Sequence, residues 1–495
     1  MCAFRKLTPW APGVLLGLTL AALAGLEGCV QTRELFGTQA DAGLPTDTAV
    51  ADVDPMPPVP PVTPLPSPQQ LAWQAQELTA FFHFGINTFT NKEQSFGTDN
   101  PTLFNPTGLD ISQWMNTLSG AGFRHAMLTA KHVDGFCLWQ TKCTPYSVAA
   151  ATSWMGGGGD VVSLFVQAAK QAKIGVGLAI DPSAGTAANE ALLLCELKEL
   201  LTNYGPIDEI WVWGGSSVPV PASFDWAAVA DLVHKLQPQA LLDDGDLIKS
   251  VGADVRSTGQ ALPSATQIDQ SSVQPDPTGA AKPPIWYPAE AVYRTRTGWF
   301  WHAAENASFL PLNQLIDIYY NAVGRNSLLR LNLSPDNRGL LFEGDVAIMN
   351  QFGAAITGIY QTNVAAGQPA TASSVFMNLP TYAAAMAVDG KLDTYWAAAD
   401  STTPVRLEID LGGPRMFNVV SIQEPIAIGE RITKHSVEAM VNGAWTTIAA
   451  NGTFVGHRKL HRVGPITASA IALVISGARG TPAVAEFGAY LSPNP

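Results

Sequence analysis

The sequence predicts an α/β protein in two parts, a (β/α)8-like TIM barrel followed by an all-β jelly-roll or β-sandwich domain. Between Trp73 and about Leu341, short apolar runs alternate with amphipathic segments, which is typical of parallel strands covered by helices. The number of these units favours a closed barrel over an open sheet. Residues 367–495 instead contain short Val- and Thr-rich runs broken by Gly, Pro and Asn, a pattern typical of an antiparallel sandwich.

The elements of the barrel follow from these runs in chain order. A helix near Asp345–Gln361 then leads into the sandwich. The predicted strands are 81–89, 125–131, 174–181, 209–215, 240–244 and 328–333, and the predicted helices are 111–118, 161–173, 187–204, 226–236 and 315–323. We therefore place the barrel at 70–345, a connecting helix at 346–366 and the sandwich at 367–495.

Composition limits the partners of the chain. Only 14% of the 495 residues are charged and 47% are hydrophobic, which argues against wholesale disorder. The net charge of −13 disfavours nucleic acid as a partner. No glycine-rich phosphate loop follows any predicted strand, so we expect no nucleotide or other cofactor.

The N-terminus has the features of an export signal. A basic start (MCAFRK) precedes an apolar stretch over Trp10–Leu26, and small residues come before Cys29, so residues 1–29 are predicted to be a signal peptide. Cys29 after Gly28 resembles a bacterial lipobox, whose cysteine is diacylated, and Val30 after it favours the outer membrane. An ordinary signal peptide with an incidental Cys29 remains the alternative. A Pro-rich disordered linker over 30–69 would then separate the lipid anchor from the globule.

The remaining cysteines give no metal pattern. Cys137, Cys143 and Cys195 cannot all pair with one another, and none is in a CxxC spacing. We expect all three to be unpaired and the chain to bind no metal.

Candidate functional residues stand where predicted strands end. His83 follows one strand, His132 and Asp134 follow a second, and Asp181 ends a third, while EIWVWGG places Trp213 at the end of a fourth. Since the active site of a (β/α) barrel lies at the C-terminal ends of its strands, we expect these side chains to share one site.

Several segments carry a resemblance to a known family. FFHFGINTFTNKE, FRHAMLTAKHVDGFCLW, KIGVGLAIDP, PIDEIW, GWFWHAAEN and NSLLRLNLSPDNRGL occur in an order that resembles the catalytic barrel of the α-L-fucosidases, glycoside hydrolase family 29. PATASS, AVDGKLDTYWAA and LEIDLGGPRMFNVVSIQEP are similar to a discoidin-like (F5/8 type C) carbohydrate-binding domain. The resemblance implies fucosylated or other glycans as partners and a retaining hydrolysis that uses two carboxyl groups about 5 Å apart.

The resemblance also identifies departures at the positions that carry the chemistry. The family nucleophile lies in a motif like E-x-W-F-D-G, which places Trp213 at its position. The acid/base Glu of R-W-x-G-N-E falls at Ala261. Asp181 and Glu290 are the carboxylates that could substitute. The retained sugar-binding positions would be His83, His132, Asp134, Arg256, Trp299 and Trp301.

Three functional hypotheses follow. The first is an exported, fucosidase-like lipoprotein of the outer membrane or cell surface that binds fucosylated glycans with impaired catalysis. The second is an active retaining α-L-fucosidase that uses a displaced carboxylate. The third is a structural surface protein without enzymatic activity or affinity for glycans.

The sandwich offers further candidates with two interpretations each. Trp396 would contact a sugar or belong to the core, and His457 with Arg458 would face a ligand. Asp389 and Glu486 would bind Ca²⁺, with Asp393 as a third ligand, or would cap turns.

Overall fold

The computed structural model describes most of the chain from Pro58 onward. The predicted signal peptide with Cys29 and the position of Ala261 lie outside the described residues. The described residues are 58–183, 187–213, 218–243, 253–257, 269–277, 279 and 281–493.

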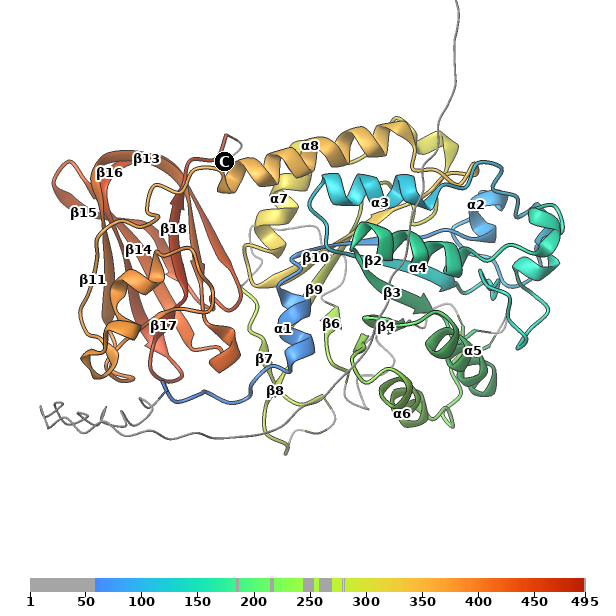
Figure 1. The fold of residues 1–495 in the computed structure, drawn as a ribbon, viewed down its shortest axis with the longest axis horizontal. Coiled ribbons are helices and arrows are strands. Elements are labelled where there is room, and N and C mark those ends of the chain that lie inside the picture. The colour runs from blue at the N-terminus through green and yellow to red at the C-terminus, as the bar shows by residue number, and fades with distance from the viewer. Residues whose placement is uncertain are drawn as a thin grey trace, which may run out of the picture. The chain divides into compact units, whose positions relative to one another are not determined.

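Eight parallel strands form the sheet of the first domain. Hydrogen bonds link them in the order β5-β4-β3-β2-β1-β10-β9-β6, and a parallel bridge from Asp243 to Val255 connects the two ends of this series. The strands therefore close into a ring, which confirms the predicted barrel. Figure 1 shows the curled parallel sheet with helices on its outer side. In chain order the strands are β1 (Leu78–Phe82), β2 (His125–Lys131), β3 (Gly175–Ile180), β4 (Glu209–Val212), β5 (Leu241–Asp243), β6 (Arg256–Ser257), β9 (Ala289–Arg294) and β10 (Ser327–Leu333).

Four helices of the barrel begin at polar residues that satisfy free backbone N–H groups. The side chains of Asp110, Asp160, Asn189 and Asp225 each accept a hydrogen bond from an N–H in the first turn of the helix that follows. These caps fix where the chain turns from loop to helix. The helices are α1 (Pro68–Gln74), α2 (Ile86–Thr90), α3 (Ile111–Gly120), α4 (Val161–Ala172), α5 (Glu190–Asn203), α6 (Trp226–Leu236), α7 (Leu312–Ala322) and α8 (Glu343–Tyr360).

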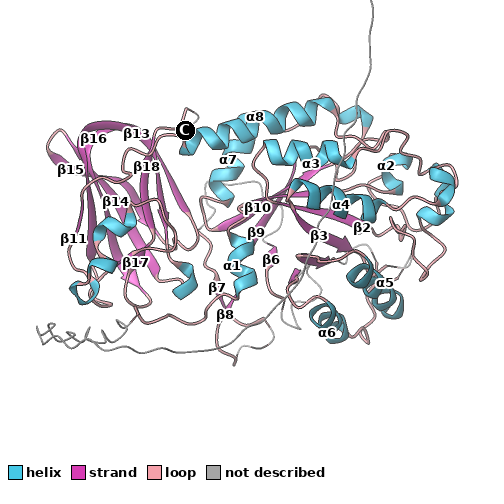
Figure 2. Ribbon diagram, in the orientation of Figure 1, coloured by secondary structure: helices cyan, strands magenta, loops and turns pink. Residues whose placement is uncertain are grey.

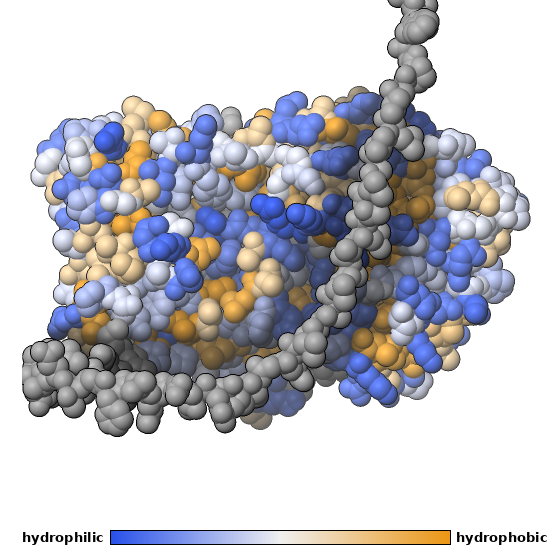
Figure 3. Space-filling view, in the orientation of Figure 1, coloured by the Kyte–Doolittle hydropathy of each residue, from blue (hydrophilic) through white to orange (hydrophobic). Residues whose placement is uncertain are grey.

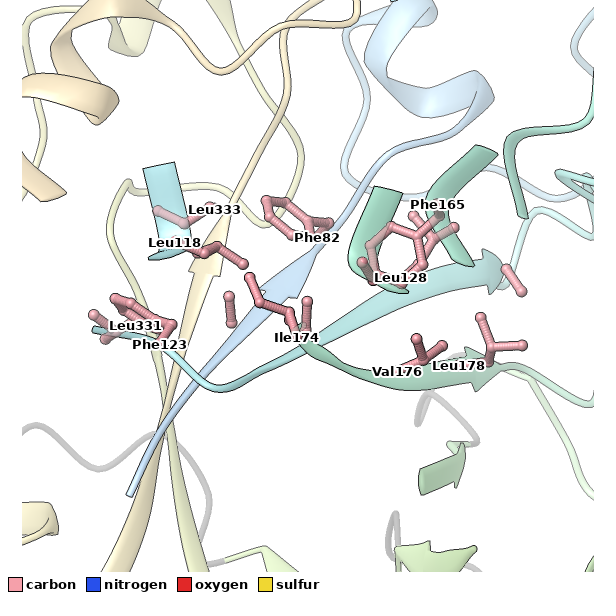
Figure 4. Close-up of a cluster of buried hydrophobic side chains, with 14 of the residues drawn as sticks. Phe82, Leu118, Phe123, Leu128, Phe165, Ile174, Val176, Leu178, Leu331 and Leu333 are labelled. Atoms are coloured by element: carbon pink, nitrogen blue, oxygen red, sulfur yellow. The ribbon is translucent and has the colours of Figure 1, made fainter. Parts of the chain in front are cut away.

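The main hydrophobic core lies between the outer face of the strand ring and these helices. Phe82 of β1 and Leu128 of β2 are fully buried and belong to one cluster with Leu118 of α3 and Phe165 of α4 (Figure 4). The rings of Phe82 and Phe165 meet edge to face with centroids 6.1 Å apart. Because side chains alternate between the two faces of a strand, the neighbouring residues point into the ring.

The inner face of the ring carries a buried ion network near the strand starts. Arg330 of β10 donates from Nε to Glu290 of β9 and from Nη2 to Glu209 of β4, both at 2.7 Å. All three side chains are fully buried. Burial raises the pKa of Glu290 to about 7, against the opposing charge of Arg330 and with the help of the charge on Glu209. The network ties three strands of the ring together across its interior.

Asp243 lies close to the same network. Glu209, Asp243 and Glu290 form the only group of His, Cys, Asp or Glu side chains in the described part of the chain that could hold a metal ion, with candidate atoms within 4.8 Å of one another. The guanidinium of Arg330 already supplies a positive charge to two of these carboxylates. We therefore assign no metal to this group.

An antiparallel sandwich follows the barrel and confirms the predicted all-β domain (Figure 2). Its larger sheet has the order β11-β13-β16-β14-β15, with β18 paired to β13, and β12 pairs with β17. Trp396 is fully buried in the core of this domain, so its interpretation as a core residue is confirmed. The strands are β11 (Ala370–Ala372), β12 (Trp396–Ala397), β13 (Val405–Gln423), β14 (Ile432–Val441), β15 (Ala444–Gly452), β16 (Lys459–Ala478), β17 (Ala483–Val484) and β18 (Glu486–Tyr490), and a separate hairpin of the barrel region contains β7 (Val273–Gln274) and β8 (Ile285–Trp286).

Polar contacts connect the sandwich to the barrel. Glu77, next to β1, accepts hydrogen bonds from Arg458 Nε at 2.6 Å and from His457 Nε2 at 2.9 Å. Although burial opposes the charge of Glu77, the nearby Arg458 and His457 lower its pKa to about 2. Asp269 forms a second, largely buried ion pair with Lys459. His457 and Arg458 thus serve this interface, contrary to the expectation that they face a ligand.

The acidic residues of the sandwich act at turns. Asp389 accepts hydrogen bonds from the backbone N–H of Lys391 and the hydroxyl group of Thr394. Glu486 accepts one from the N–H of Gly390 at 2.5 Å. These contacts favour the interpretation of Asp389 and Glu486 as turn-capping residues.

The segment Phe81–Phe89 differs from the prediction of one continuous strand. The strand ends at Phe82, and residues from Ile86 onward form the short helix α2. Short apolar runs fit both a strand and a buried helical turn, so periodicity alone does not separate them. Here Thr88 accepts a hydrogen bond from Gly85 N and Asn87 accepts one from the Ser95 hydroxyl group, which stabilises the turn.

The prediction that all three cysteines are unpaired is wrong. Cys143 and Cys195 form a disulfide across a sequence separation of 52 residues, while Cys137 is free and buried. The loop after β2 folds over α5, where Trp139 Nε1 donates to Glu199 at 2.9 Å, and this contact brings the two cysteines together. Sequence spacing could not identify a pair that only the packing of a loop on a helix creates.

The start of the described chain also differs from the expected disordered linker. Val59 is only 1% exposed, and the carbonyl oxygen of Pro60 accepts a hydrogen bond from Arg431 of the sandwich at 2.7 Å. Ser67 caps α1 by accepting from Gln70 N. Residues 58–69 therefore belong to the folded part of the chain.

The surface seen in Figure 3 mixes hydrophilic and hydrophobic residues over the described part of the chain. Every helix within the described ranges is too short or too polar to traverse a lipid bilayer.

We expect the substitution Arg330→Met to lower the free energy of unfolding by about 3–5 kcal/mol, because it leaves Glu209 and Glu290 buried without a countercharge. Urea denaturation followed by tryptophan fluorescence measures this change. Arg462→Met removes an arginine whose ion pair with Asp317 is exposed, so this control should cost no more than about 1 kcal/mol. Equal losses in the two variants would contradict the structural role of the interior network.

Candidate functional site

The C-terminal ends of the strands bring together the residues that the sequence predicted. His83 follows β1, His132 follows β2 and Trp213 follows β4, each one residue beyond the last strand position. The loop after β9 adds Trp299 and Phe300. We call the rings of these five residues the mouth cluster.

The rings of the mouth cluster are in direct contact. Trp213 lies 5.4 Å from His83 and 4.7 Å from His132, measured between ring centroids. His83 is 4.9 Å from Trp299, and Phe300 is 5.6 Å from His83 and 4.9 Å from His132. The indole of Trp213 therefore packs against both histidines that the sequence identified as sugar-binding candidates.

Hydrogen bonds fix the orientation of His83 and of the loop that carries Trp299. His83 Nδ1 lies 2.6 Å from Asn332 Oδ1, so Nδ1 carries the proton and Nε2 is left as an acceptor. Asn332 Nδ2 donates to the carbonyl oxygen of Trp299 at 2.8 Å. The carboxylate of Glu93 accepts from the backbone N–H groups of Trp299 and Phe300 at 2.8 and 3.1 Å. The aromatic side of the site is thus held rigidly.

Burial keeps both histidines of the cluster neutral. Burial lowers the pKa of His83 well below 6.5, and the neighbouring His132 adds to the effect. Burial lowers the pKa of His132 to about 3. At neutral pH the two imidazoles therefore offer hydrogen bonds without a positive charge.

Asp134 lies beside the mouth cluster, and its pKa is raised above the ordinary value of an aspartic acid. Burial raises its pKa to about 7, and the negative charge of Asp181 contributes in the same direction, while the N–H of Phe136 opposes it. His132 Nδ1 is 3.8 Å from Asp134 Oδ2. Asp134 is only 2% exposed, so it supports the site from beneath the surface.

The two carboxylates proposed as substitutes are both fully buried. Asp181 is at the mouth end of β3 and accepts hydrogen bonds from the backbone N–H and the hydroxyl group of Ser183. Glu290 is paired in register with Leu328, near the strand starts, and binds Arg330. The structure therefore does not place Glu290 with the mouth cluster.

Two other predicted residues make different contacts. Arg256 donates to the carbonyl oxygens of Tyr287 and Ser271 and to the Gln270 side chain, which ties β6 to the neighbouring loops. Trp301 donates from Nε1 to Asn306 at 3.0 Å. The position of Ala261 lies outside the described residues.

Arg294 lies at the mouth of the barrel, although the sequence did not identify it as a candidate. Arg294 ends β9 in register with Asn332, the residue that holds His83. Its guanidinium carbon lies 5.5 Å from the ring centroid of Trp299. The sequence does carry a sign of this position. Glu290 and Arg294 lie on the same face of one strand, and two charged residues on one face of a buried strand indicate the interior of a barrel.

The arrangement defines a class of protein before any comparison is made. A closed ring of eight parallel strands places aromatic rings and neutral imidazoles at its C-terminal end, the region where (β/α) barrels bind their ligands. Flat apolar rings beside hydrogen-bonding groups suit the C–H faces and hydroxyl groups of a sugar. The fold is that of a (β/α)8 barrel protein, and the groups at its mouth are of the kinds that suit a sugar.

Comparisons with known proteins identify the family. The family model described as Alpha-L-fucosidase matches residues 68–357, and that of the F5/8 type C domain matches residues 369–487. Alpha-L-fucosidase 1 of Arabidopsis thaliana is 36% identical over 450 residues, which cover 86% of this chain and 88% of the plant protein. The chain therefore belongs to the α-L-fucosidase family, glycoside hydrolase family 29.

Solved structures agree with this assignment. A family 29 fucosidase of Ruminococcus gnavus in complex with fucose is similar with a TM-score of 0.80 at 26% identity, covering 88% of this chain and 96% of that one. A family member from Bacteroides thetaiotaomicron has a TM-score of 0.81 at 32% identity, covering 88% of this chain and all of the other.

The pKa of Asp134 predicts a pH-dependent stability. The folded-state value of about 7 lies above the ordinary value of 3.8, so the stabilisation from the bound proton is complete below about pH 4 and is lost as the pH rises through 7. Relative to Asp134→Asn, we expect the unfolding free energy of the wild type to fall on the order of 3 kcal/mol between pH 4 and pH 8. Urea denaturation across this range measures the difference. The exposed Asp231→Asn variant is the control and should follow the wild-type curve.

Proposed function

We propose that this chain binds fucose-containing glycans at the barrel mouth and has lost the retaining hydrolysis of its family. The observation that carries the proposal is the position of Trp213. Its indole stands where the family motif has the nucleophilic Asp, and it packs against His83 and His132. The fucose-bound relative from Ruminococcus gnavus supports fucose as the sugar.

The chemistry of the family explains why this change matters. Retaining hydrolysis needs one carboxylate to attack the anomeric carbon and a second carboxyl group to protonate the leaving oxygen, about 5 Å apart. An indole cannot form the glycosyl ester, and loss of a nucleophile typically costs on the order of 10⁴–10⁶ in rate. The substitution of the acid/base position by Ala261, inferred from the family motif, acts in the same direction.

The displaced-carboxylate hypothesis has one observation in its favour. Asp134, with its pKa near 7, and Asp181 are neighbouring carboxyl groups at the mouth end of the barrel. Both are almost completely buried, and Asp181 already accepts two hydrogen bonds from Ser183. A sugar at the mouth cluster would therefore contact the rings before it reached either carboxylate.

The sandwich fits the same proposal. The resemblance to an F5/8 type C domain implies carbohydrate binding, and this domain is joined to the barrel by Glu77 and Asp269. We propose that it adds glycan contacts to those of the barrel mouth. The hypothesis of a structural protein without glycan affinity would fail if the full-length chain bound a fucosylated oligosaccharide.

Hydrolysis of an aryl α-L-fucoside with an activated leaving group tests the loss of catalysis, since such a substrate needs little help from a general acid. We expect no turnover by the wild type, whereas Trp213→Asp should restore slow release of the phenol. Trp213→Asn, which has the shape of Asp without its nucleophilicity, is the matched control and should stay inactive. The wild-type protein should still bind a neutral fucose-terminated oligosaccharide in calorimetry. Wild-type turnover that Asp181→Asn abolishes would instead establish the displaced-carboxylate mechanism.

We also propose that the protein is exported and anchored to a bacterial outer membrane or cell surface through a lipid on Cys29. The Cys143–Cys195 disulfide supports export, because disulfides persist in oxidising compartments. The Trp10–Leu26 stretch followed by Gly28-Cys29 supports the anchor.

The anchor is tested by fractionation of cells that produce the full-length protein. Wild type should be in the membrane fraction and carry diacylglycerol on Cys29, whereas Cys29→Ala should lose the lipid and leave that fraction. Cys2→Ala changes a cysteine of the same leader outside the lipobox and should behave as the wild type. A Cys29→Ala protein that remained lipidated would refute the assignment.

A further inference from the structure

We propose that Arg294 makes the barrel mouth select saccharides that carry an anionic group, a carboxylate or a sulfate ester, next to the sugar bound by the mouth cluster. This inference rests on the proposed glycan binding at the mouth and adds the chemical class of the preferred ligand.

The side chains of β9 alternate between the inside and the outside of the barrel, and this alternation places Arg294 on the inside. Glu290 points into the barrel, where it binds Arg330, and residues at even spacing share that face of the strand. Arg294 is four residues further along, at the mouth end, in register with Asn332. Asn332 holds His83, so Arg294 belongs to the wall of the same site.

The guanidinium of Arg294 is available for a ligand. It forms no hydrogen bond or ion pair with any described residue, and its guanidinium carbon lies 5.5 Å from the centroid of the Trp299 ring. The side chain is half-buried. A cation over an aromatic ring makes no hydrogen bond to that ring, so the N–H groups of the guanidinium remain able to bind a carboxylate or sulfate, which a guanidinium does through two parallel hydrogen bonds.

No carboxylate of the described residues forms an ion pair with Arg294, and the carboxylates near the mouth accept hydrogen bonds from other groups. Glu93 directs its carboxylate to the backbone N–H groups of Trp299 and Phe300 and to His302. Asp134 and Asp181 are buried beneath the surface of the site. His83 and His132 are held neutral by burial, so they neither repel nor attract an anion.

The replacement of a carboxylate by Trp213 at the nucleophile position also favours an anionic ligand. A working retaining site carries two carboxyl groups at the mouth, and at least one negative charge there repels an anionic sugar. With Trp213 at one of these positions, that repulsion is removed while the arginine remains. A neutral sugar that covered Arg294 would leave a cation partly desolvated, whereas an anionic sugar would pair with it.

The experiment compares three oligosaccharides of the same backbone, each with a terminal fucose: one neutral, one carrying a sulfate ester and one carrying a uronic acid. Calorimetry with the full-length protein should give at least about tenfold tighter binding of one or both anionic forms than of the neutral form at low salt. The preference should shrink as the ionic strength rises. The sulfate and uronate arms distinguish the two sources of negative charge.

Three variants assign the preference to Arg294. Arg294→Gln should remove the preference, so that the neutral and anionic oligosaccharides bind with equal affinity, and Arg294→Lys should keep part of it. Arg124→Gln removes an equivalent charge from an exposed residue just before β2, at the opposite end of the barrel, and should keep the full preference. Thermal melting confirms that each variant is folded.

The possible failures are separable. Equal affinity of the wild type for neutral and anionic oligosaccharides would overturn the role of Arg294 and leave the proposed glycan binding intact. An anion preference that persisted in Arg294→Gln would also overturn it. Absence of binding to all three would overturn this inference together with the glycan-binding proposal, whereas binding accompanied by hydrolysis would overturn only the loss of catalysis.

Discussion

The pairing of Arg330 with Glu209 and Glu290 is the interaction on which the geometry of the site depends. It joins β10 to β4 and β9 across the interior of the barrel, at 2.7 Å to each carboxylate. A charge network of this kind costs much to bury, and it tolerates little displacement because each member needs its partner. It therefore fixes how these three strands are placed relative to one another.

The mouth lies two layers of side chains above this network. Trp213 comes four residues after Glu209, and Arg294 comes four residues after Glu290, so both point to the same side of their strands as the buried carboxylates. Asn332, which orients His83, comes two residues after Arg330. The lower layer thus sets the position of the residues that meet a ligand, even though none of its members reaches the surface.

The sequence was most informative where local patterns decide the structure. HAMLTAK became β2 and Trp226–Leu236 became α6 with the predicted bounds, because continuous apolar runs and amphipathic periods are local signals. The family motifs likewise located His83, His132 and Trp213, which do meet in one site. Their shared position follows from the rule that parallel strands end at the same face of the barrel.

What could not be predicted depends on contacts between distant segments. Strand β9 carries Glu290 and Arg294 within six residues, which argues against a strand until Arg330 and the barrel interior are known to accommodate them. The disulfide required the loop after β2 to lie on α5. The motif placed Arg256 at a sugar-binding position, which stays a prediction, but it gave no sign of the hydrogen bonds from Arg256 to Tyr287 and Gln270.

The proposed loss of a catalytic carboxylate is compatible with the stability of the barrel for a physical reason. A nucleophilic Asp at the mouth must be held ionised beside apolar rings, which disfavours the folded state. An indole at the same position instead gains contacts with His83, His132 and Phe81. Under the proposed loss of hydrolysis, Trp213 adds to the packing that the fold already uses. The same step removes a negative charge from a mouth whose wall carries Arg294, a cation that contacts the ring of Trp299. A change in the ligand that is preferred can therefore follow from a single loss in the catalytic machinery.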